Sequence, residues 1–125
     1  LEKLMARCLS GYTSIIMMDL INSYRAQRSW IKAHSLMGSQ DQSLALLAIR
    51  KAIDLEPNKK KIPEYLELQG HIESSSGKMN LALQSFHRAI KIMRENRALF
   101  NRQETAELER RILEAIEEIE DRIET

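Results

Sequence analysis

The chain has 125 residues, of which 43% are hydrophobic and 30% are charged, and its formal net charge is +1. This length and apolar content suit one domain with its own core, and the low Gly, Pro and aromatic content beside abundant helix-forming residues predicts an all-α fold. Cys8 is the only cysteine, which excludes an intrachain disulfide, and no apolar run in the sequence approaches the roughly 20 residues of a membrane span.

Two features bear on where the protein acts. A chain without paired cysteines suits a reducing compartment, so we expect a cytoplasmic protein with no membrane span. The chain begins at Leu1 rather than Met, which suggests a piece of a longer or processed protein.

Residues 1–24 form the first predicted helix, because apolar residues recur there at steps of three and four. Gly11 interrupts the pattern at a cost of about 1 kcal/mol relative to Ala, so the helix either is held by packing or breaks at that residue. A second helical stretch covers residues 23–37 and ends beside Gly38, which suits the left-handed conformation that follows many helices.

The middle of the chain predicts three further helices. Ser39 followed by Gln42 is typical of a capping box, and the helix that it opens ends before a Pro-Asn pair. Pro63 suits the first turn of the next helix, over residues 63–75, where its missing N–H costs nothing. After a loop of Ser and Gly, an apolar stripe predicts a fourth helix.

Residues 103–125 are predicted to form a last amphipathic helix, with Asn101 and Glu104 as its cap. Its apolar stripe consists of Leu108, Ile112, Ile116, Ile119 and Ile123. Residues 104–125 hold 9 acidic and 3 basic residues, whereas residues 1–103 hold 9 acidic and 16 basic ones. Either the rest of the chain covers the apolar stripe and neutralises the acidic charge, which makes this helix a cap, or a partner does so.

The region between the first and last helices contains two helix pairs with related spacing. In the second pair, small residues and one aromatic residue occupy the positions Gly70, Gly77, Ala82, Phe86 and Ala89. In the first pair, Ala33, Ala45, Ile49 and Ala52 stand where the second pair has Gly70, Ala82, Phe86 and Ala89, and Pro57 ends the unit. Small side chains let two helices approach closely and a large one fills the gap between them, and in these positions the chain resembles the tetratricopeptide repeat.

The resemblance implies tandem antiparallel helix pairs, a fragment of an α-solenoid, closed by a C-terminal amphipathic capping helix. The expected parts of the single domain 1–125 are an N-terminal helix or half-repeat at 1–24, repeats at 26–58 and 63–96, and the cap at 103–125. Proteins of this family generally act as scaffolds, chaperones or co-chaperones that hold a peptide or helix in a groove lined by the first helix of each pair. The resemblance places on that groove Gln27, Trp30, His34, Glu64, Glu67 and His71.

Three of these groove residues have a second interpretation. His34 and His71 occupy equivalent positions and would face each other as a metal-binding or pH-sensing pair, but two ligands alone make a poor metal site. We therefore favour groove lining and expect no metal or cofactor. Trp30 is the only tryptophan and suits an interface anchor, although a core position is favoured.

A basic face is predicted along the fourth helix, where positive residues recur at steps of three. It consists of Arg88, Lys91, Arg94 and Arg97. This face is solvated, covered by the acidic last helix, or open to phosphate. The run Lys59–Lys60–Lys61 adjoins no aromatic residues and is interpreted as a solvated loop, so nucleic-acid binding is disfavoured.

No catalytic motif is recognisable, and we expect a binding protein rather than an enzyme. The leading hypothesis is an adaptor that binds a peptide or helix of another protein in the groove. The alternative is an assembly module that forms homo-oligomers through the stripe of the last helix. Nucleic-acid binding through the basic face of the fourth helix is the third hypothesis.

Overall fold

The computed structural model describes the backbone of residues 2–38 and 41–124, and the side chains from residue 15 onward within those ranges. Within these ranges lie five α-helices and one short 3-10 helix, namely α1 Glu2–Leu36, α2 Gln42–Leu55, α3 Ile62–Ser75, α4 Met79–Glu95, η1 Arg97–Leu99 and α5 Arg102–Glu124. The described residues form no strand, so the prediction of an all-α fold is confirmed. None of the described helices is long and apolar enough to cross a membrane.

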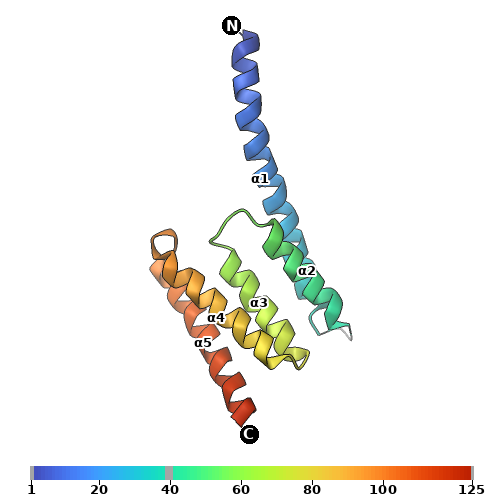
Figure 1. Cartoon of the computed structure of the whole chain (residues 1–125), viewed down its shortest axis with the longest axis vertical. Helices are drawn as coiled ribbons and strands as arrows, with labels where there is room; N and C mark the ends of the chain where they lie inside the picture. The colour runs from blue at the N-terminus through green and yellow to red at the C-terminus, as the bar shows by residue number, and fades with distance from the viewer. Residues whose placement is uncertain (1, 39–40, 125) are drawn as a thin grey trace.

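The helices pack largely in chain order (Figure 1). α1 pairs with α2 and α3 pairs with α4 as two antiparallel hairpins, α3 also contacts α2, and α5 lies against α4 and α3. The N-terminal half of α1 projects well beyond the other helices.

α1 is one continuous helix of 35 residues, whereas the sequence pattern predicts two stretches that meet near residue 24. The physical reason is that no Gly or Pro lies between Tyr12 and Met37, so nothing in that span ends a helix. Gly11 lies inside α1 and does not break it. The expected boundary between a half-repeat at 1–24 and a repeat at 26–58 is therefore not a boundary between helices.

Local signals set the ends of the helices. Gly38 has φ +90° after α1, as predicted for a residue that follows a helix. Asp41 caps α2, because its carboxylate accepts an N–H of the first turn at 3.2 Å. The predicted cap residue Ser39 lies outside the described residues. The side chain of Asn101 accepts an N–H of the first turn of α5 at 3.1 Å, so Asn101 is confirmed as a cap residue.

The first core cluster lies between α1, α2 and α3. It consists of Ala26, Ala33, Ala45, Leu46, Ala48, Ile49, Ala52, Tyr65, Leu68 and Ile72. The many alanines let α1 and α2 approach closely. Glu56, just after α2, ties the three helices together, since it accepts hydrogen bonds from the hydroxyls of Tyr65 at 3.0 Å and Ser23 at 3.4 Å.

The second core cluster lies between α3, α4 and α5, and Gly70 permits a close contact between α3 and α4. A Cβ atom added at Gly70 would lie 2.6 Å from ring atoms of Phe86. Phe86, Ala82 and Ala89 are all 0% exposed. The residues on which the sequence resemblance depends therefore fill the interface between α3 and α4.

α5 covers the apolar side of α4 with most of its predicted stripe. Leu108, Ile112, Ile116 and Ile119 are at most 7% exposed, whereas Ile123 is 53% exposed. An ion pair between Arg94 Nη2 and Glu109 Oε1, 2.9 Å long, also joins α4 to α5. The C-terminal helix thus folds back on its own chain.

Candidate binding groove

Five of the six predicted groove residues line one recess of about 380 Å³. Trp30 and His34 come from α1, and Glu64, Glu67 and His71 come from α3. The lining also includes Met37, Leu68 and Arg111. Gln27 is exposed on α1 and is not part of the lining.

The recess continues along α3 in both directions. It shares Glu64 and Arg111 with a recess of about 360 Å³ near the start of α3, and Met37 and His71 with a recess of about 220 Å³ near its end. From Glu64 to Ser75, the part of α3 beside these recesses is about 16 Å long. We call the three adjoining recesses the groove, and α1, α3 and α5 form its walls.

Trp30 lies between the groove and the first core cluster. Its ring centroid is 4.8 Å from that of His34, with the planes nearly perpendicular, and 5.9 Å from that of Tyr65. The side chain is half-buried, and its Nε1 is buried without a hydrogen-bond partner among the described residues. Trp30 therefore packs on the core and also lines the groove, so it has features of both the core position and the interface anchor that the sequence suggests.

Arg111 of α5 pairs with Glu67 of α3 inside the groove. Nε lies 3.1 Å from Oε2 and Nη2 lies 3.3 Å from Oε1, which is the two-pronged geometry of a strong Arg–carboxylate pair. The hydrogen bonding to Glu67 raises the pKa of Arg111 above its ordinary value, so the guanidinium stays charged. The sequence prediction missed Arg111, because only the tertiary packing of α5 brings this side chain to α3.

The two groove histidines contact aromatic rings. His71 packs against Phe86 with ring centroids 5.2 Å apart, and His34 packs edge-on against Trp30. In the part of the chain that the structure describes, no group of three or more His, Cys, Asp or Glu side chains is placed to hold a metal ion. These contacts make both histidines walls of the groove.

Tyr65 fixes the wall formed by α3. Burial raises the pKa of its hydroxyl well above the ordinary value, and the hydrogen bond to the Glu56 carboxylate adds to that rise. Tyr65 therefore remains a hydrogen-bond donor at neutral pH and holds the first turns of α3 to the end of α2.

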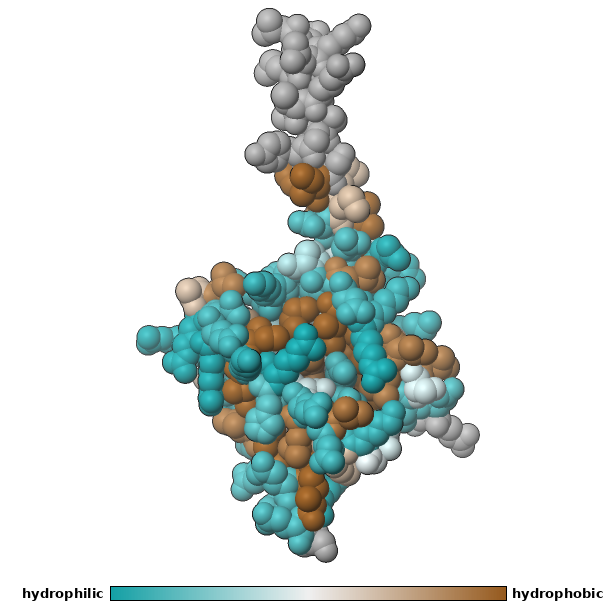
Figure 2. All heavy atoms as spheres, in the orientation of Figure 1, coloured by the Kyte–Doolittle hydropathy of each residue, from teal (hydrophilic) through white to brown (hydrophobic). Residues whose placement is uncertain are grey.

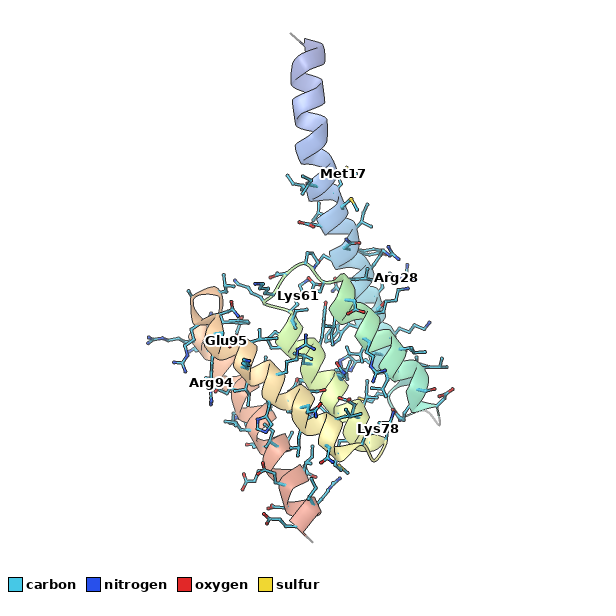
Figure 3. All side chains as sticks on the ribbon, viewed as in Figure 1. Met17, Arg28, Lys61, Lys78, Arg94 and Glu95 are labelled. Carbon is cyan, nitrogen blue, oxygen red and sulfur yellow. The ribbon has the colours of Figure 1, made fainter. Side chains whose placement is uncertain are left out.

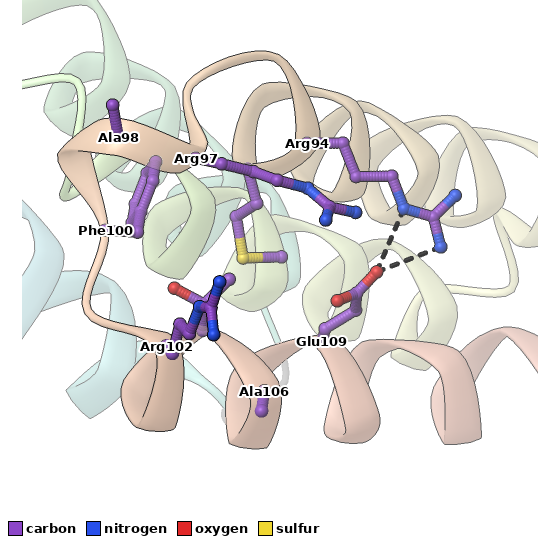
Figure 4. Close-up of a pocket in the computed structure, with 9 residues that line it drawn as sticks. Arg94, Arg97, Ala98, Phe100, Arg102, Ala106 and Glu109 are labelled. Carbon is purple, nitrogen blue, oxygen red and sulfur yellow. Dashed lines mark hydrogen bonds and ion pairs between the residues drawn. The ribbon is translucent and has the colours of Figure 1, made fainter.

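The basic face predicted for the fourth helix is divided in the structure. Arg94 donates from Nε to Glu109 of α5 at 3.0 Å, and Lys91 lies 4.0 Å from a glutamate one turn later. Arg97 lies in η1 rather than in α4, and with Arg94 it lines a recess of about 570 Å³ between the end of α4 and the start of α5 (Figure 4). Arg88 is exposed. The acidic last helix therefore covers part of this face, which is one of the arrangements that the sequence predicts.

No family model matches the sequence, and neither a curated protein nor a solved structure shows significant similarity to it. A functional assignment therefore rests on the groove, the charge distribution and the packing of the helices.

Proposed function

We propose that this protein is an adaptor that holds a peptide or helix of another protein in the groove between α1, α3 and α5. The observation that carries the proposal is that side chains from three helices distant in sequence line three adjoining recesses. The central recess, of about 380 Å³, has the size of sites that bind discrete ligands, which is roughly 300–1,000 Å³. The length of about 16 Å admits about five extended residues or three turns of a helix.

The packing of the helix pairs supports a relation to tetratricopeptide repeats. The small residues Gly70 and Ala82 bring α3 close to α4, and Phe86 fills the space between them. Ala45 and Ile49 are fully buried in the first pair. In proteins of that family the first helices of the pairs line the groove, and α1 and α3 hold those positions here. We infer a scaffold or chaperone-like role in the cytoplasm.

The groove favours a ligand that carries both apolar and basic side chains. Trp30 and Met37 offer apolar contact surface. Glu64 is exposed, whereas Glu67 is already neutralised by Arg111. A large apolar side chain of the ligand would therefore pack on Trp30, and a basic one would pair with Glu64.

The other two hypotheses have less support. Four of the five stripe residues of α5 are buried within the chain, so homo-oligomers formed through that stripe would require α5 to leave α4. Nucleic-acid binding through the basic face would require phosphate to compete with Glu109 for Arg94.

Affinity capture from a native lysate, followed by titration, tests the proposal. Glu64→Lys reverses a charge in the groove, and Asp54→Lys makes the same change at an exposed position on α2. A partner held in the groove is lost from Glu64→Lys and retained by Asp54→Lys. Because Trp30 is the only tryptophan, its fluorescence reports binding when that partner is titrated. Partners that bind both variants equally and leave this fluorescence unchanged would show that the groove is not the site.

A further inference from the structure

The recess of about 570 Å³ between the end of α4 and the start of α5 is separate from the groove, although the two adjoin at Phe100 and Thr105. It lies at the edge of the molecule away from α1, where Figure 3 shows Arg94. Hydrophilic and apolar residues lie side by side over that end of α4 (Figure 2). We call it the arginine recess, because Arg94, Arg97 and Arg102 line it.

Two of the three arginines in the recess have no acidic partner. Arg94 pairs with Glu109, with its Nε 3.0 Å and its Nη2 2.9 Å from Oε1 of that carboxylate. No ion pair or side-chain hydrogen bond to Arg97 or Arg102 is present in the part of the chain that the structure describes. Both of these side chains lie in the space between η1 and α5 in Figure 4. With three arginines and one glutamate, the lining has a formal charge of +2.

Apolar side chains form most of the remaining lining. Met93 is 1% exposed within the second core cluster, and the half-buried Phe100 packs against that cluster. Ala98 on η1 and Ala106 on α5 are exposed. A ligand with both an anionic group and an apolar body suits this lining, since an anion alone would leave the apolar walls in contact with water. The volume of about 570 Å³ lies within the roughly 300–1,000 Å³ of sites for small organic ligands.

We propose that the arginine recess binds a phosphate monoester whose organic part is aromatic or otherwise apolar. Such a group carries a charge of about −1.5 to −2 at pH 7, which matches the formal charge of the lining. Guanidinium groups donate paired hydrogen bonds to phosphate oxygens, and Arg97 and Arg102 supply these donors. The apolar part of the ligand then packs on Phe100.

The charge of the recess also distinguishes among ligands that contain phosphate. Two unpaired arginines at one recess match a single phosphate group, whereas a nucleic acid presents a row of phosphates and is bound by a row of cations. Aromatic and apolar phosphate monoesters occur both as free small molecules and as phosphotyrosine side chains of proteins, and the test below distinguishes these two sources. The proposal is independent of what the groove binds.

Two-dimensional NMR of the isotope-labelled full chain, titrated with phenyl phosphate at about pH 7.5, tests the proposal. Amide shifts are expected to change within residues 93–109, and phenyl phosphate should bind at least ~10-fold more tightly than inorganic phosphate or phenol. Arg97→Gln with Arg102→Gln should weaken the binding of phenyl phosphate at least ~10-fold. Arg50→Gln with Arg88→Gln removes the same charge at exposed positions outside the recess and should change the affinity by less than about twofold.

Both Arg97 and Arg102 are exposed, so Gln is expected to preserve the fold, and the NMR spectrum of each variant verifies this. A short peptide with one phosphotyrosine distinguishes the sources, because tighter binding than that of phenyl phosphate indicates a phosphorylated protein and equal or weaker binding indicates a small molecule. The proposal is overturned if phenyl phosphate causes no shifts at the recess up to ~10 mM, or if inorganic phosphate binds equally well. It is also overturned if the Arg97/Arg102 variant binds phenyl phosphate as tightly as the Arg50/Arg88 control.

Discussion

Gly70→Ala is expected to destabilise the protein, although Ala is normally the better residue within a helix. In an exposed helix interior this change stabilises by about 1 kcal/mol. At Gly70, however, the new Cβ would lie 2.6 Å from two ring atoms of Phe86 and 2.9 Å from a third. Phe86 is 0% exposed and lies between α3 and α4, so its ring must shift within a packed interface to accept the new atom.

The balance of the two effects gives the expected magnitude. Overpacking a close contact in a core costs ~1–3 kcal/mol, which outweighs the helix-propensity gain of about 1 kcal/mol. We expect a net loss of ~1–2 kcal/mol in the free energy of unfolding. In a Phe86→Ala background, which itself costs ~3–5 kcal/mol, the clash is absent and Gly70→Ala should stabilise by up to ~1 kcal/mol.

Urea unfolding followed by circular dichroism measures both effects as a double-mutant cycle. The expected coupling between residues 70 and 86 is ~2–3 kcal/mol, with the sign of the Gly70→Ala effect reversed between the two backgrounds. Phe86→Leu replaces Phe86→Ala if the latter is too unstable to measure. A Gly70→Ala protein as stable as the wild type would refute the close packing of α3 on α4.

Three further predictions concern the cap, the α2–α3 junction and the groove. Ile112→Ala should lower the free energy of unfolding by ~2–5 kcal/mol, because Ile112 is fully buried on the face of α5 that packs on the second core cluster; a change below ~1 kcal/mol in urea unfolding would contradict the cap. Tyr65→Phe should cost ~1.5–3 kcal/mol at pH 7. Folding raises the pKa of Tyr65, so the stability that its hydroxyl contributes is fully present below the ordinary tyrosine pKa of about 10 and declines as the pH rises above that value. Above about pH 10, the stabilities of the wild type and Tyr65→Phe should therefore converge. Arg111→Ala should change stability by less than ~1 kcal/mol, yet increase acrylamide quenching of Trp30, whereas Arg110→Ala should leave the quenching unchanged.

Features that depend on residues close in sequence could be predicted well. The third helix was expected over residues 63–75 and spans Ile62–Ser75, because a proline and a serine-glycine loop bound it. The buried positions Ala82, Phe86 and Ala89 follow from spacing along one helix and are all 0% exposed. Most of the lining of the central recess could be predicted because residues of α1 and α3 occupy equivalent positions in their pairs.

Contacts between distant parts of the chain could not be predicted. Arg111 and Glu67 are 44 residues apart, and nothing in the sequence pattern distinguishes Arg111 from the other charged residues of α5. The continuity of α1 was also undecided, because Gly11 lowers the helix propensity without by itself ending a helix. These features are set by how the helices meet, and no residue within one helix specifies that.

A buried polar pair between α3 and α4 provides the last prediction. Glu73 is 2% exposed, and its Oε1 accepts a hydrogen bond from the hydroxyl of Ser85, which is 6% exposed. No ion pair to Glu73 is present among the described residues. A buried carboxylate that loses its donor is expensive, whereas replacing both partners by apolar groups can be nearly neutral.

Ser85→Ala should therefore lower the free energy of unfolding by ~1–3 kcal/mol, because it leaves Glu73 buried without that donor. The double variant Ser85→Ala with Glu73→Leu should recover most of this loss or exceed the wild type, since it removes the buried charge as well. Ser75→Ala, at an exposed position of α3, is the matched control and should have little effect. Urea unfolding of the four proteins decides the matter: if Ser85→Ala is as stable as the Ser75→Ala control, Glu73 does not depend on Ser85, and the contact is incidental to the packing of α3 on α4.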